Sequence, residues 1–529
     1  MSRDSPGHAS GEQVMNGAHS LVRTLIASGV EVCFTNPGTS EIHFVAALGA
    51  EPKMRAILGL FEGVVTGAAD GYARMKGKPA CTLLHLGPGL ANGLANLHNA
   101  RRARVPVVNI VGEHATYHRH LDAPLTSDIR SIASAVSGWI RVSQDANSVA
   151  QDGAEAVAAS YGPPGQIATL ILPADTAWER AGPPADPIPS RAPSSPDDAL
   201  VEDVARTLRD AGASGTLLMN GSALSGEGMA LAGKVAAATG ARVFSDTFVT
   251  RMARGAGRVN VPRVPYLGEQ ALELLQGTRH LVTVGTKAPV SFFAYPGMPG
   301  ELTPTGCTVH ALAEPAEDGM AALAALVEAL DATSAIPVTE SLVRPPLPTG
   351  PLNPKAIAQV IAHLLPENAI VMNEALTAGW SVPGFTSSSA PHDWLDLVGG
   401  AIGQGMPAAT GAAVACPDRK VLSLQADGSG MYTLQALWTQ AREELDVTTV
   451  IFSNRRYAIL DMEYSRIGAG DPSAATRSLF DLSRPDLDWV GLARSMGVEG
   501  VRATTAEELV RGLGVGFGEP GPYLVEAVL

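Results

Sequence analysis

Two polar residues, Asp427 and Asn454, each follow an apolar run that is typical of a buried parallel strand. Val421 to Gln425 ends in an Asp-Gly turn, and Val447 to Phe452 ends just before Asn454. Because the carboxyl ends of parallel strands share one edge of an open α/β sheet, where such sheets bind ligands, we expect the two side chains to lie together. Their oxygens suit a hard cation such as Mg²⁺. Taken singly, each turn is equally well explained as a loop closure.

A helix is expected to begin near Ser429 and to carry Leu434, Leu437 and Trp438. The free amides at a helix start, together with the helix dipole, favour an anion such as phosphate. A cation site and an anion site therefore fall at the same sheet edge. This combination predicts that the segment 421–460 binds a metal together with a diphosphate.

Proline-rich segments divide the chain, whose 529 residues suit about three domains of roughly 150–200 residues each. The segments 182–196 and 344–354 resist helix and sheet, so we predict domains at 14–181, 190–343 and 350–529. Short apolar strands alternate with helical stretches, which predicts an α/β fold of three doubly wound parallel-sheet domains. The strands expected in the first two domains are 31–34, 54–59, 80–86, 105–111, 216–220, 241–244 and 281–284.

The composition argues against several classes of partner. A formal net charge of −14 disfavours a nucleic-acid surface, which needs clustered Lys and Arg. No apolar run reaches the roughly 18 residues of a membrane-spanning helix, and the polar start of the chain through Gln13 does not fit a signal peptide. We interpret the widely spaced cysteines as reduced core residues of a cytoplasmic protein. They are Cys33, Cys81, Cys307 and Cys416.

Glu62 stands at the expected start of a helix from Gly63 to Met75, directly after Leu60 and Phe61. A glutamate in this position is commonly there because the helix dipole stabilises its charge. A glutamate desolvated by apolar neighbours can instead exchange a proton with a cofactor nitrogen, because burial raises the pKa of a carboxyl. The residues around Glu62 leave both interpretations open.

The chain resembles thiamine-diphosphate-dependent enzymes of the acetolactate synthase and benzoylformate decarboxylase kind. In that family a Gly-Asp-Gly turn is followed, after 25–30 residues, by Asn-Asn, and here Asn454 follows Asp427 by 27 residues. Ala426 and Ser453 depart from the motif without removing a ligand. The segments NPGTSEIHFVAAL and LFEGVVTGAADGYAR are similar to the pyrimidine-binding domain of the same family. The resemblance covers nearly all of the first and third domains.

This resemblance implies a pyrimidine-binding, a central and a diphosphate-binding domain, with thiamine diphosphate and Mg²⁺ as cofactors. Asp427 and Asn454 would be metal ligands together with the main-chain carbonyl of Arg456. Glu62 would be the catalytic acid on the cofactor's pyrimidine ring. The remaining cofactor contacts implied are Gly38, Thr39, Leu376, Thr377, Gly400, Ile402, Gly428, Ser429 and Tyr457.

The segment GGAIG at 399–403 resembles the family segment that bends the cofactor. Ile402 would be the apolar wedge under the two rings, and the carbonyl of Gly400 would accept a hydrogen bond from the exocyclic amine. The small residues that follow also favour close helix packing. Thr377, implied at the diphosphate, is equally typical of a helix cap.

The segment from His85 to Asn92 follows a strand and opens a helix, which is a rough dinucleotide-binding layout. Asn92 replaces its third glycine, and Pro88 removes a backbone donor where pyrophosphate would bind, so we reject a nicotinamide dehydrogenase. The segment also resembles the substrate-facing loop of benzoylformate-type decarboxylases, with His85 as a catalytic histidine. A core histidine explains His85 equally well.

Two further groups are implied at the substrate pocket. Where the benzoylformate-type decarboxylases hold a second histidine, this chain has Phe292 or Phe293, which would give an apolar wall. His114, with His118 and His120, lines either the pocket entrance or an exposed polar loop. In the central domain, the segment 221–226 lies where some family members hold FAD or ADP. It lacks a compact glycine fingerprint, so we predict no flavin.

The resemblance implies an enzyme that acts on a 2-oxo acid. Acetolactate synthase-like decarboxylation with transfer to an acceptor carbonyl is the first interpretation, and simple benzoylformate-type decarboxylation is the second. A catalytically silent cofactor-binding subunit is a third interpretation, against which Glu62 argues. Family members pair the first domain of one subunit with the third domain of another, so we expect a homodimer or homotetramer.

Overall fold

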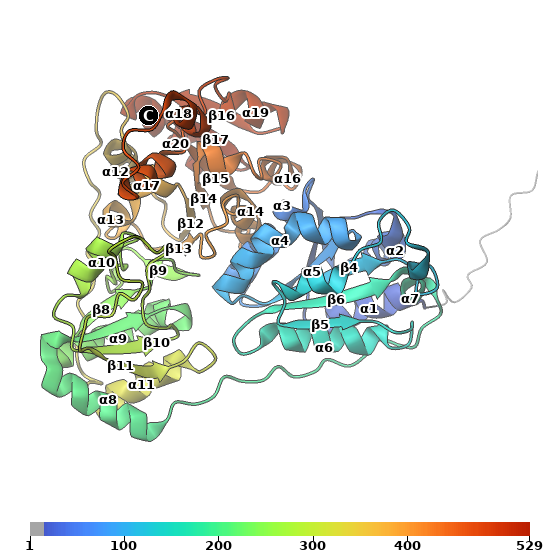
Figure 1. Ribbon diagram of the computed structural model, residues 1–529, viewed down its shortest axis with the longest axis horizontal. Coiled ribbons are helices and arrows are strands. Elements are labelled where there is room, and N and C mark those ends of the chain that lie inside the picture. The colour runs from blue at the N-terminus through green and yellow to red at the C-terminus, as the bar shows by residue number, and fades with distance from the viewer. Residues whose placement is uncertain (1–14) are drawn as a thin grey trace, which may run out of the picture.

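Three sheets frame residues 15–529, the part of the chain that the computed structural model describes (Figure 1). In Figure 1 the first sheet and its helices lie at the right, the second at the lower left and the third at the top. Helices separate most of the strands along the chain. The predicted α/β fold class with three doubly wound sheets is confirmed.

The first sheet is parallel throughout and is covered on both faces. Its strands are, in spatial order, β2 (Arg55–Leu58), β1 (Val32–Asn36), β3 (Ala80–Leu84), β4 (Val107–Glu113), β6 (Ile167–Pro173) and β5 (Trp139–Val142). Successive side chains of β1 face opposite sides. Phe34 packs with α3 (Glu62–Lys76) and α4 (Leu86–Ala103), whereas Cys33 packs with α1 (Gly17–Ala27). Helices α2 (Ile42–Ala50) and α6 (Val149–Tyr161) complete the second face.

The second sheet is smaller and also parallel. Its strands are β11 (Thr308–Ala313), β10 (His280–Val284), β7 (Gly215–Met219) and β8 (Arg242–Ser245). Its main helices are α8 (Asp198–Ala211), α9 (Gly226–Thr239), α10 (Gly268–Leu275) and α11 (Gly319–Ala329). Its apolar core continues into that of the third sheet, because Val282 and Leu217 belong to the same buried cluster as Trp394.

The third sheet has the order β16 (Glu499–Ala503), β17 (Tyr523–Val528), β15 (Val447–Ser453), β14 (Val421–Ala426), β12 (Ala369–Glu374), β13 (His392–Asp396) and β9 (Met252–Arg254). Strand β9 is antiparallel to β13, although it belongs by sequence to the predicted central domain. The sequence analysis missed it, because three residues give no alternating pattern to read. The predicted domain boundaries themselves stay predictions.

Helix α3 crosses α14 (Gly405–Ala415) at backbone contact. A Cβ added at Gly411 would lie 1.8 Å from the carbonyl oxygen of Ala68, and one added at Gly71 would lie 2.0 Å from that of Ala408. Only glycine allows so close an approach. The close packing expected of these small-residue segments is therefore confirmed, and it fixes the first domain against the third.

A buried ion pair reinforces the same crossing. Asp70 and Arg74 on α3 form two hydrogen bonds with each other, at 2.8 and 2.9 Å, and neither side chain is exposed. Arg74 also donates to the carbonyl oxygen of Asp396, at 2.7 Å, and Gln404 donates to Asp70. Since a buried charge needs such partners, this network ties α3 to the segment that leads into α14.

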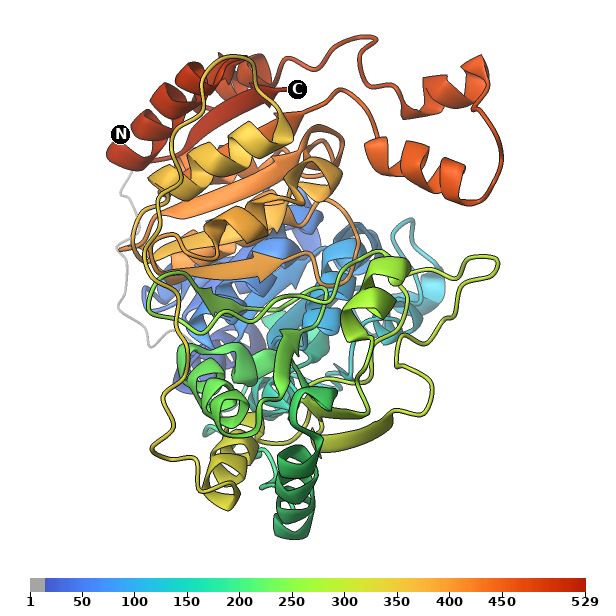
Figure 2. The same cartoon turned by 90° about the vertical axis from the view of Figure 1, so that its left-hand side faces the viewer.

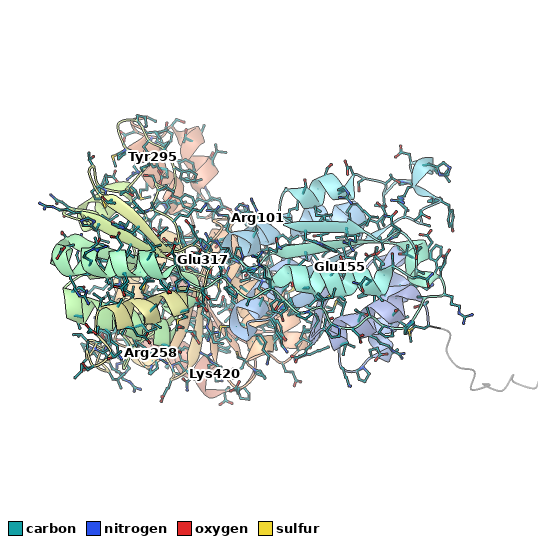
Figure 3. The ribbon with its side chains drawn as sticks, turned by 90° about the horizontal axis from the view of Figure 1, so that it is seen from below. Arg101, Glu155, Arg258, Tyr295, Glu317 and Lys420 are labelled. Atoms are coloured by element: carbon teal, nitrogen blue, oxygen red, sulfur yellow. The ribbon has the colours of Figure 1, made fainter. Side chains whose placement is uncertain are left out.

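Helices α17 (Ala458–Arg466) and α18 (Ala474–Phe480) project from the rest of the third domain (Figure 2). Neither helix has a buried residue. Helix α17 reaches the central domain at Tyr295, whose hydroxyl donates to Glu463 at 2.5 Å and whose ring centroid lies 4.5 Å from the guanidinium of Arg466 (Figure 3). This short contact fastens the projecting helices to the segment that holds Phe292 and Phe293.

Three details of the sequence analysis need comment. Residues 182–193 and 333–349 contain no helix or strand, as their prolines predicted. Cys33 and Cys81 are buried opposite each other on β1 and β3. Cys307 and Cys416 are only partly buried, so the prediction that every cysteine is a core residue is wrong for these two. No helix within residues 15–529 has the length and apolar character needed to span a membrane.

Candidate active site

Asp427 lies at the carboxyl edge of the third sheet, directly after β14, and is 2% exposed. Its carboxylate accepts hydrogen bonds from the backbone N–H of Gly428, at 2.8 Å, and of Arg455, at 2.5 Å. Burial raises the pKa of Asp427 to about 6, and these two donors oppose the shift. A buried carboxylate of this kind is well suited to a cation.

The Asn454 turn lies beside Asp427, because β14 and β15 are neighbours in the sheet. Arg455 adopts a left-handed backbone, with φ of +55°, which turns its N–H toward Asp427. The side-chain oxygen of Asn454 accepts from the backbone N–H of Arg456 at 3.1 Å. The structure therefore brings together Asp427 and the turn that presents Asn454 and Arg456, as the sequence predicted.

The helix that was expected to begin near Ser429 is different in the structure. A single turn, α15 (Asp427–Gly430), follows the strand, and Leu437 lies on a separate helix, α16 (Ala436–Arg442). Gly428 and Gly430 favour helix poorly, which explains the early end. One turn has little dipole, so the anion argument made from a long helix was wrong.

Gly428 and Tyr457 are in close contact at this edge. A Cβ added at Gly428 would lie 2.4 Å from Cε1 of Tyr457. Ser429 is buried and bridges strand and turn, because its hydroxyl donates to the carbonyl oxygen of Ala426 at 3.2 Å and accepts from Gln425 at 2.6 Å. Glycine at 428 thus allows the Tyr457 ring to pack directly against the backbone.

The segment 399–405 precedes α14 and contains Gly400 and Gly403, whose φ angles of +77° and +97° favour glycine. Helix α4 of the first domain holds this segment. Asn99 donates to the carbonyl oxygen of Ala401, at 2.8 Å, and accepts from its N–H, at 3.1 Å. Asn96 donates to the carbonyl oxygen of Gly403 at 3.2 Å. Ile402 is partly buried at the middle of the segment.

Glu374 supports the segment 399–405 from the end of β12. It is fully buried and accepts from the backbone N–H of Gly403, at 2.5 Å, and also from that of Gly405. Burial raises the pKa of Glu374 to about 7, and the backbone donors oppose the shift. Leu376 and Thr377 follow in the short helix η5 (Leu376–Gly379), where Leu376 has a φ of +48°. Thr377 lies inside this turn and does not cap it.

Glu62 begins α3, as expected, and is 7% exposed. Its carboxylate accepts a hydrogen bond from the side-chain amide of Asn92 on α4 at 3.0 Å. The position of a Cβ added at Gly89 lies 3.5 Å from Glu62 Oε1 and 3.3 Å from Cβ of His85. Glu62 and His85 are therefore close neighbours on either side of Gly89.

His85 is held by a second buried carboxylate. Its Nδ1 lies 2.7 Å from Oε2 of Glu41, which is 4% exposed, and 3.2 Å from the hydroxyl of Ser40. Glu41 also accepts from the backbone N–H of Gly38 at 3.0 Å. A carboxylate at Nδ1 favours the tautomer with the proton on that nitrogen, so Nε2 is left for a ligand. His85 is only partly buried, and its catalytic role stays a prediction.

Two separate cavities contain the residues that the resemblance assigned to the substrate. His85, His114 and Thr39 line a pocket of about 330 Å³ in the first domain. Phe292 lines a larger cavity of about 1240 Å³, which also contains residues 221–226 and Gly399. Phe292 packs over Gly400, where an added Cβ would lie 2.8 Å from its ring, and Phe293 stacks edge-on against Phe292. The prediction of no flavin stays a prediction.

The residues at the edge of the third sheet fit a magnesium diphosphate. They supply a buried carboxylate, an amide oxygen and a backbone carbonyl as oxygen ligands, and glycine at 428 lets the Tyr457 ring lie against the backbone of this turn. Within residues 15–529 no group of three or more His, Cys, Asp or Glu side chains is placed to hold a metal ion by itself. A site with one carboxylate therefore needs oxygens from the diphosphate.

Comparison with known proteins agrees with this geometry. The family model described as thiamine pyrophosphate enzyme, N-terminal TPP binding domain, matches residues 15–134, and that of the C-terminal TPP binding domain matches residues 377–527. The chain therefore belongs to the thiamine-diphosphate-dependent enzymes, which confirms the resemblance drawn from the sequence.

Named relatives fall into two groups. A Mycobacterium tuberculosis protein, provisionally named acetolactate synthase large subunit IlvX, is 54% identical over 97% of this chain and 99% of its own. Benzoylformate decarboxylase of Pseudomonas aeruginosa is 29% identical over 94% of this chain and 96% of its own. The structure of a Rhodococcus jostii 4-hydroxybenzoylformate decarboxylase has the same fold, with a TM-score of 0.81, 23% identity and coverage of 97% and 99%.

The sequence analysis missed three groups of residues. They are Glu374, which supports the segment 399–405, Glu41, which contacts His85, and the asparagines of α4 that hydrogen-bond to the same segment. Glu374 is the last residue of β12, and a polar residue at the carboxyl end of a strand is a signal that could have been used. Glu41 lies three residues after Gly38 and closes the turn at the start of α2. Asn96 and Asn99 share one helix face at the spacing of neighbouring turns, but nothing in the sequence names their partner.

Proposed function

We propose that the protein is a thiamine-diphosphate- and Mg²⁺-dependent enzyme of the cytoplasm that removes carbon dioxide from a 2-oxo acid and joins the remaining fragment to an acceptor carbonyl. The observation that carries this proposal is the buried carboxylate of Asp427 beside the Asn454 turn. Family membership supports the cofactor, and the relative at 54% identity supports an acetolactate synthase-like reaction.

Asp427 and Asn454 would hold the magnesium ion, with the carbonyl oxygen of Arg456 as third ligand. Residues around Gly428, Ser429, Leu376 and Thr377 would receive the diphosphate. Gly38 and Thr39 would contact the cofactor from the first domain. When bound, thiamine diphosphate supplies the thiazolium that accepts the electrons of the bond to carbon dioxide.

Glu62 would give a proton to the pyrimidine ring of the cofactor and take it back. Its hydrogen bond to Asn92, 3.0 Å long, would hold the carboxyl in one orientation. Gly400 would accept from the exocyclic amine through its carbonyl, and Ile402 would support both rings from below. The Glu374 and Asn99 contacts would keep this segment in place.

The two halves of this site would meet between copies of the chain. Glu62 and His85 lie at the edge of the first sheet, Asp427 lies at the edge of the third, and the substrate residues of a single chain line two cavities. A homodimer or homotetramer would bring the first domain of one copy to the third domain of its partner.

Simple decarboxylation is the second candidate, and His85 favours it. A histidine whose Nδ1 is held by Glu41 can protonate the carbon that loses carbon dioxide, and this releases an aldehyde. Phe292 and Phe293 favour the first candidate, because an apolar wall protonates nothing and leaves the carbon free to attack an acceptor.

Product analysis decides between the two candidates. Pyruvate and benzoylformate are each incubated with the holoenzyme, with and without an acceptor aldehyde, and the products are separated by chromatography. We expect a hydroxyketone as the main product, and we expect Phe292→His to shift the ratio toward aldehyde. Aldehyde as the sole product in every mixture would favour the plain decarboxylase and contradict the first candidate.

A further inference from the structure

A pocket of about 330 Å³ lies at the carboxyl ends of four adjacent strands of the first sheet, β1, β3, β4 and β6. This edge is where an open α/β sheet binds its ligands. The residues around the pocket come from the four connections that follow these strands. They are Thr39, Ser40, His43, His85, Leu86, His114, Ala115, Tyr117, His118, Leu125, Ala174 and Trp178.

Imidazoles dominate the polar lining. Four histidines contribute, namely His43, His85, His114 and His118, and the rings of His114 and His118 are 5.6 Å apart. Among the residues that the structure describes, no Asp, Glu, Lys or Arg lines this pocket. Imidazoles and hydroxyls donate hydrogen bonds, so the lining suits an anion.

His114 carries a ring nitrogen without a hydrogen-bond partner in the described chain. Its Nε2 is buried and has no hydrogen-bond partner among residues 15–529. A buried polar atom without a partner destabilises a protein, so such atoms commonly mark a place that a ligand fills. The apolar walls formed by Leu86, Leu125 and Trp178 leave space for a short carbon chain between the histidines.

The two ends of the pocket differ in what lies next to them. His85 lies next to Glu62 across Gly89, so its end of the pocket is nearest to the proposed reaction centre. His43 and His114 lie on other connections, after β1 and β4. A ligand that reaches from His85 to these residues would place one end at the chemistry and the other among imidazoles.

If these donors held the carboxylate that is lost, they would oppose the reaction. Donors that stabilise a carboxylate in the ground state raise the barrier to its departure as neutral carbon dioxide, because the charge they bind leaves that carboxylate. The same donors cost nothing when they hold a carboxylate that stays on the substrate. The lining therefore points to a second acidic group, distant from the oxo group.

We propose that the substrate is a 2-oxo dicarboxylic acid whose distal carboxylate binds in this histidine pocket, with His114 and His118 as the residues that select it. This inference rests on the proposed function, since it names the substrate class of the same site. The histidines of the pocket belong to the first domain. Binding of a dicarboxylate to them can be measured without catalytic turnover.

Glutarate and pentanoate are the probes, because they share a five-carbon chain and neither carries an oxo group. Calorimetry on the full-length protein with thiamine diphosphate and Mg²⁺ should show glutarate binding at least tenfold more tightly than pentanoate. His114→Phe and His118→Phe, which keep an aromatic ring without its nitrogens, should each abolish that preference. His120→Phe is the matched control, because His120 is exposed on the same connection and lies outside the pocket lining.

Turnover then tests the substrate class, as the ratio of kcat/KM for 2-oxoglutarate to that for 2-oxopentanoate. We expect a ratio above ten in wild type and in His120→Phe, and near one in the other two variants. Glutarate that binds no better than pentanoate, or equally well to His114→Phe and His118→Phe, would overturn the inference. A selective glutarate site in a protein that decarboxylates no 2-oxo acid would instead refute the proposed function and leave the pocket assignment standing.

Discussion

Glu374 accepts a hydrogen bond from the backbone N–H of Gly403, 2.5 Å away, in a fully buried setting between β12 and the segment 399–405. The same carboxylate accepts from Gly405, so one side chain fixes both ends of the turn around Gln404. The segment 399–405, which would bend the cofactor, is therefore held in place by the titratable side chain of Glu374.

The charge on Glu374 should make stability depend on pH. Its pKa is raised from 4.5 to about 7, so the folded protein keeps a proton that the unfolded chain releases. Its contribution to stability is full below pH 4.5 and is lost as pH rises through 7. Between pH 5 and 8 the unfolding free energy of wild type should therefore fall relative to Glu374→Gln by about 2–3 kcal/mol.

Urea unfolding of cofactor-free protein measures this difference. Glu367→Gln, which changes an exposed carboxyl just before the same strand, is the control and should track wild type at every pH. If the unfolding free energies of wild type and Glu374→Gln changed in parallel with pH, the buried carboxyl would not titrate in this range.

The contact between α3 and α14 should tolerate no side chain at Gly411. An added Cβ would meet the carbonyl oxygen of Ala68 at 1.8 Å, so Gly411→Ala should destabilise the protein by about 1–3 kcal/mol. Gly514→Ala is the matched control, because Gly514 is an exposed glycine on α20 (Ala506–Gly518) with open space around it. There alanine should stabilise by up to about 1 kcal/mol. Equal unfolding midpoints for the two variants would contradict the packing.

Glu62→Gln should keep the cofactor and slow its activation. Loss of a general acid–base commonly costs a factor of about 10²–10⁴, so exchange of the thiazolium proton for deuterium should slow at least a hundredfold. NMR of quenched samples measures the exchange. Glu51→Gln, at a carboxylate that pairs with Arg23 on the surface, is the control. Unchanged exchange in Glu62→Gln would remove Glu62 from the chemistry.

Hybrid assemblies test whether two copies share a site. Glu62→Gln and Asp427→Ala should each be inactive alone. A refolded or co-expressed mixture should recover about a quarter of the wild-type activity, because about half of the dimers that form at random are hybrids and each hybrid carries one intact site of two. A fully active monomer by light scattering would contradict the shared site. The shared site would also be contradicted if dimers shown to contain both variants recovered no activity.

The sequence predicted many of the strands and the placement of Asp427, Asn454 and Glu62 at the ends of elements, because short apolar runs followed by polar turns are local patterns. The observed strand β7 is shifted by one residue at both ends from its predicted range, and β10 begins one residue earlier than predicted. Local patterns also located the start of α3, where apolar residues give way to Glu62.

Features that depend on distant partners could not be predicted in this way. In the sequence, Glu374 is recognisable only as the end of a strand, because its hydrogen-bond partner Gly403 is distant along the chain. Similarly, β9 is a strand only because it pairs with β13. The long helix expected near Ser429 does not form. Gly428 and Gly430 favour helix poorly, so α15 ends after one turn. The pocket histidines come from separate connections and meet only through the order of strands in the sheet.

Calorimetric titration with thiamine diphosphate, with and without Mg²⁺, is the most direct test of the proposed cofactor site. Wild-type protein should bind the cofactor only when the cation is present, because Asp427 supplies a single carboxylate to the proposed metal site and the diphosphate must supply the remaining charge. Asp427→Ala should lose binding under both conditions, while Asp461→Ala, at a carboxylate that pairs with Arg456 on the surface, should retain it. Equal binding without Mg²⁺, or undiminished binding by Asp427→Ala, would contradict the metal and diphosphate site.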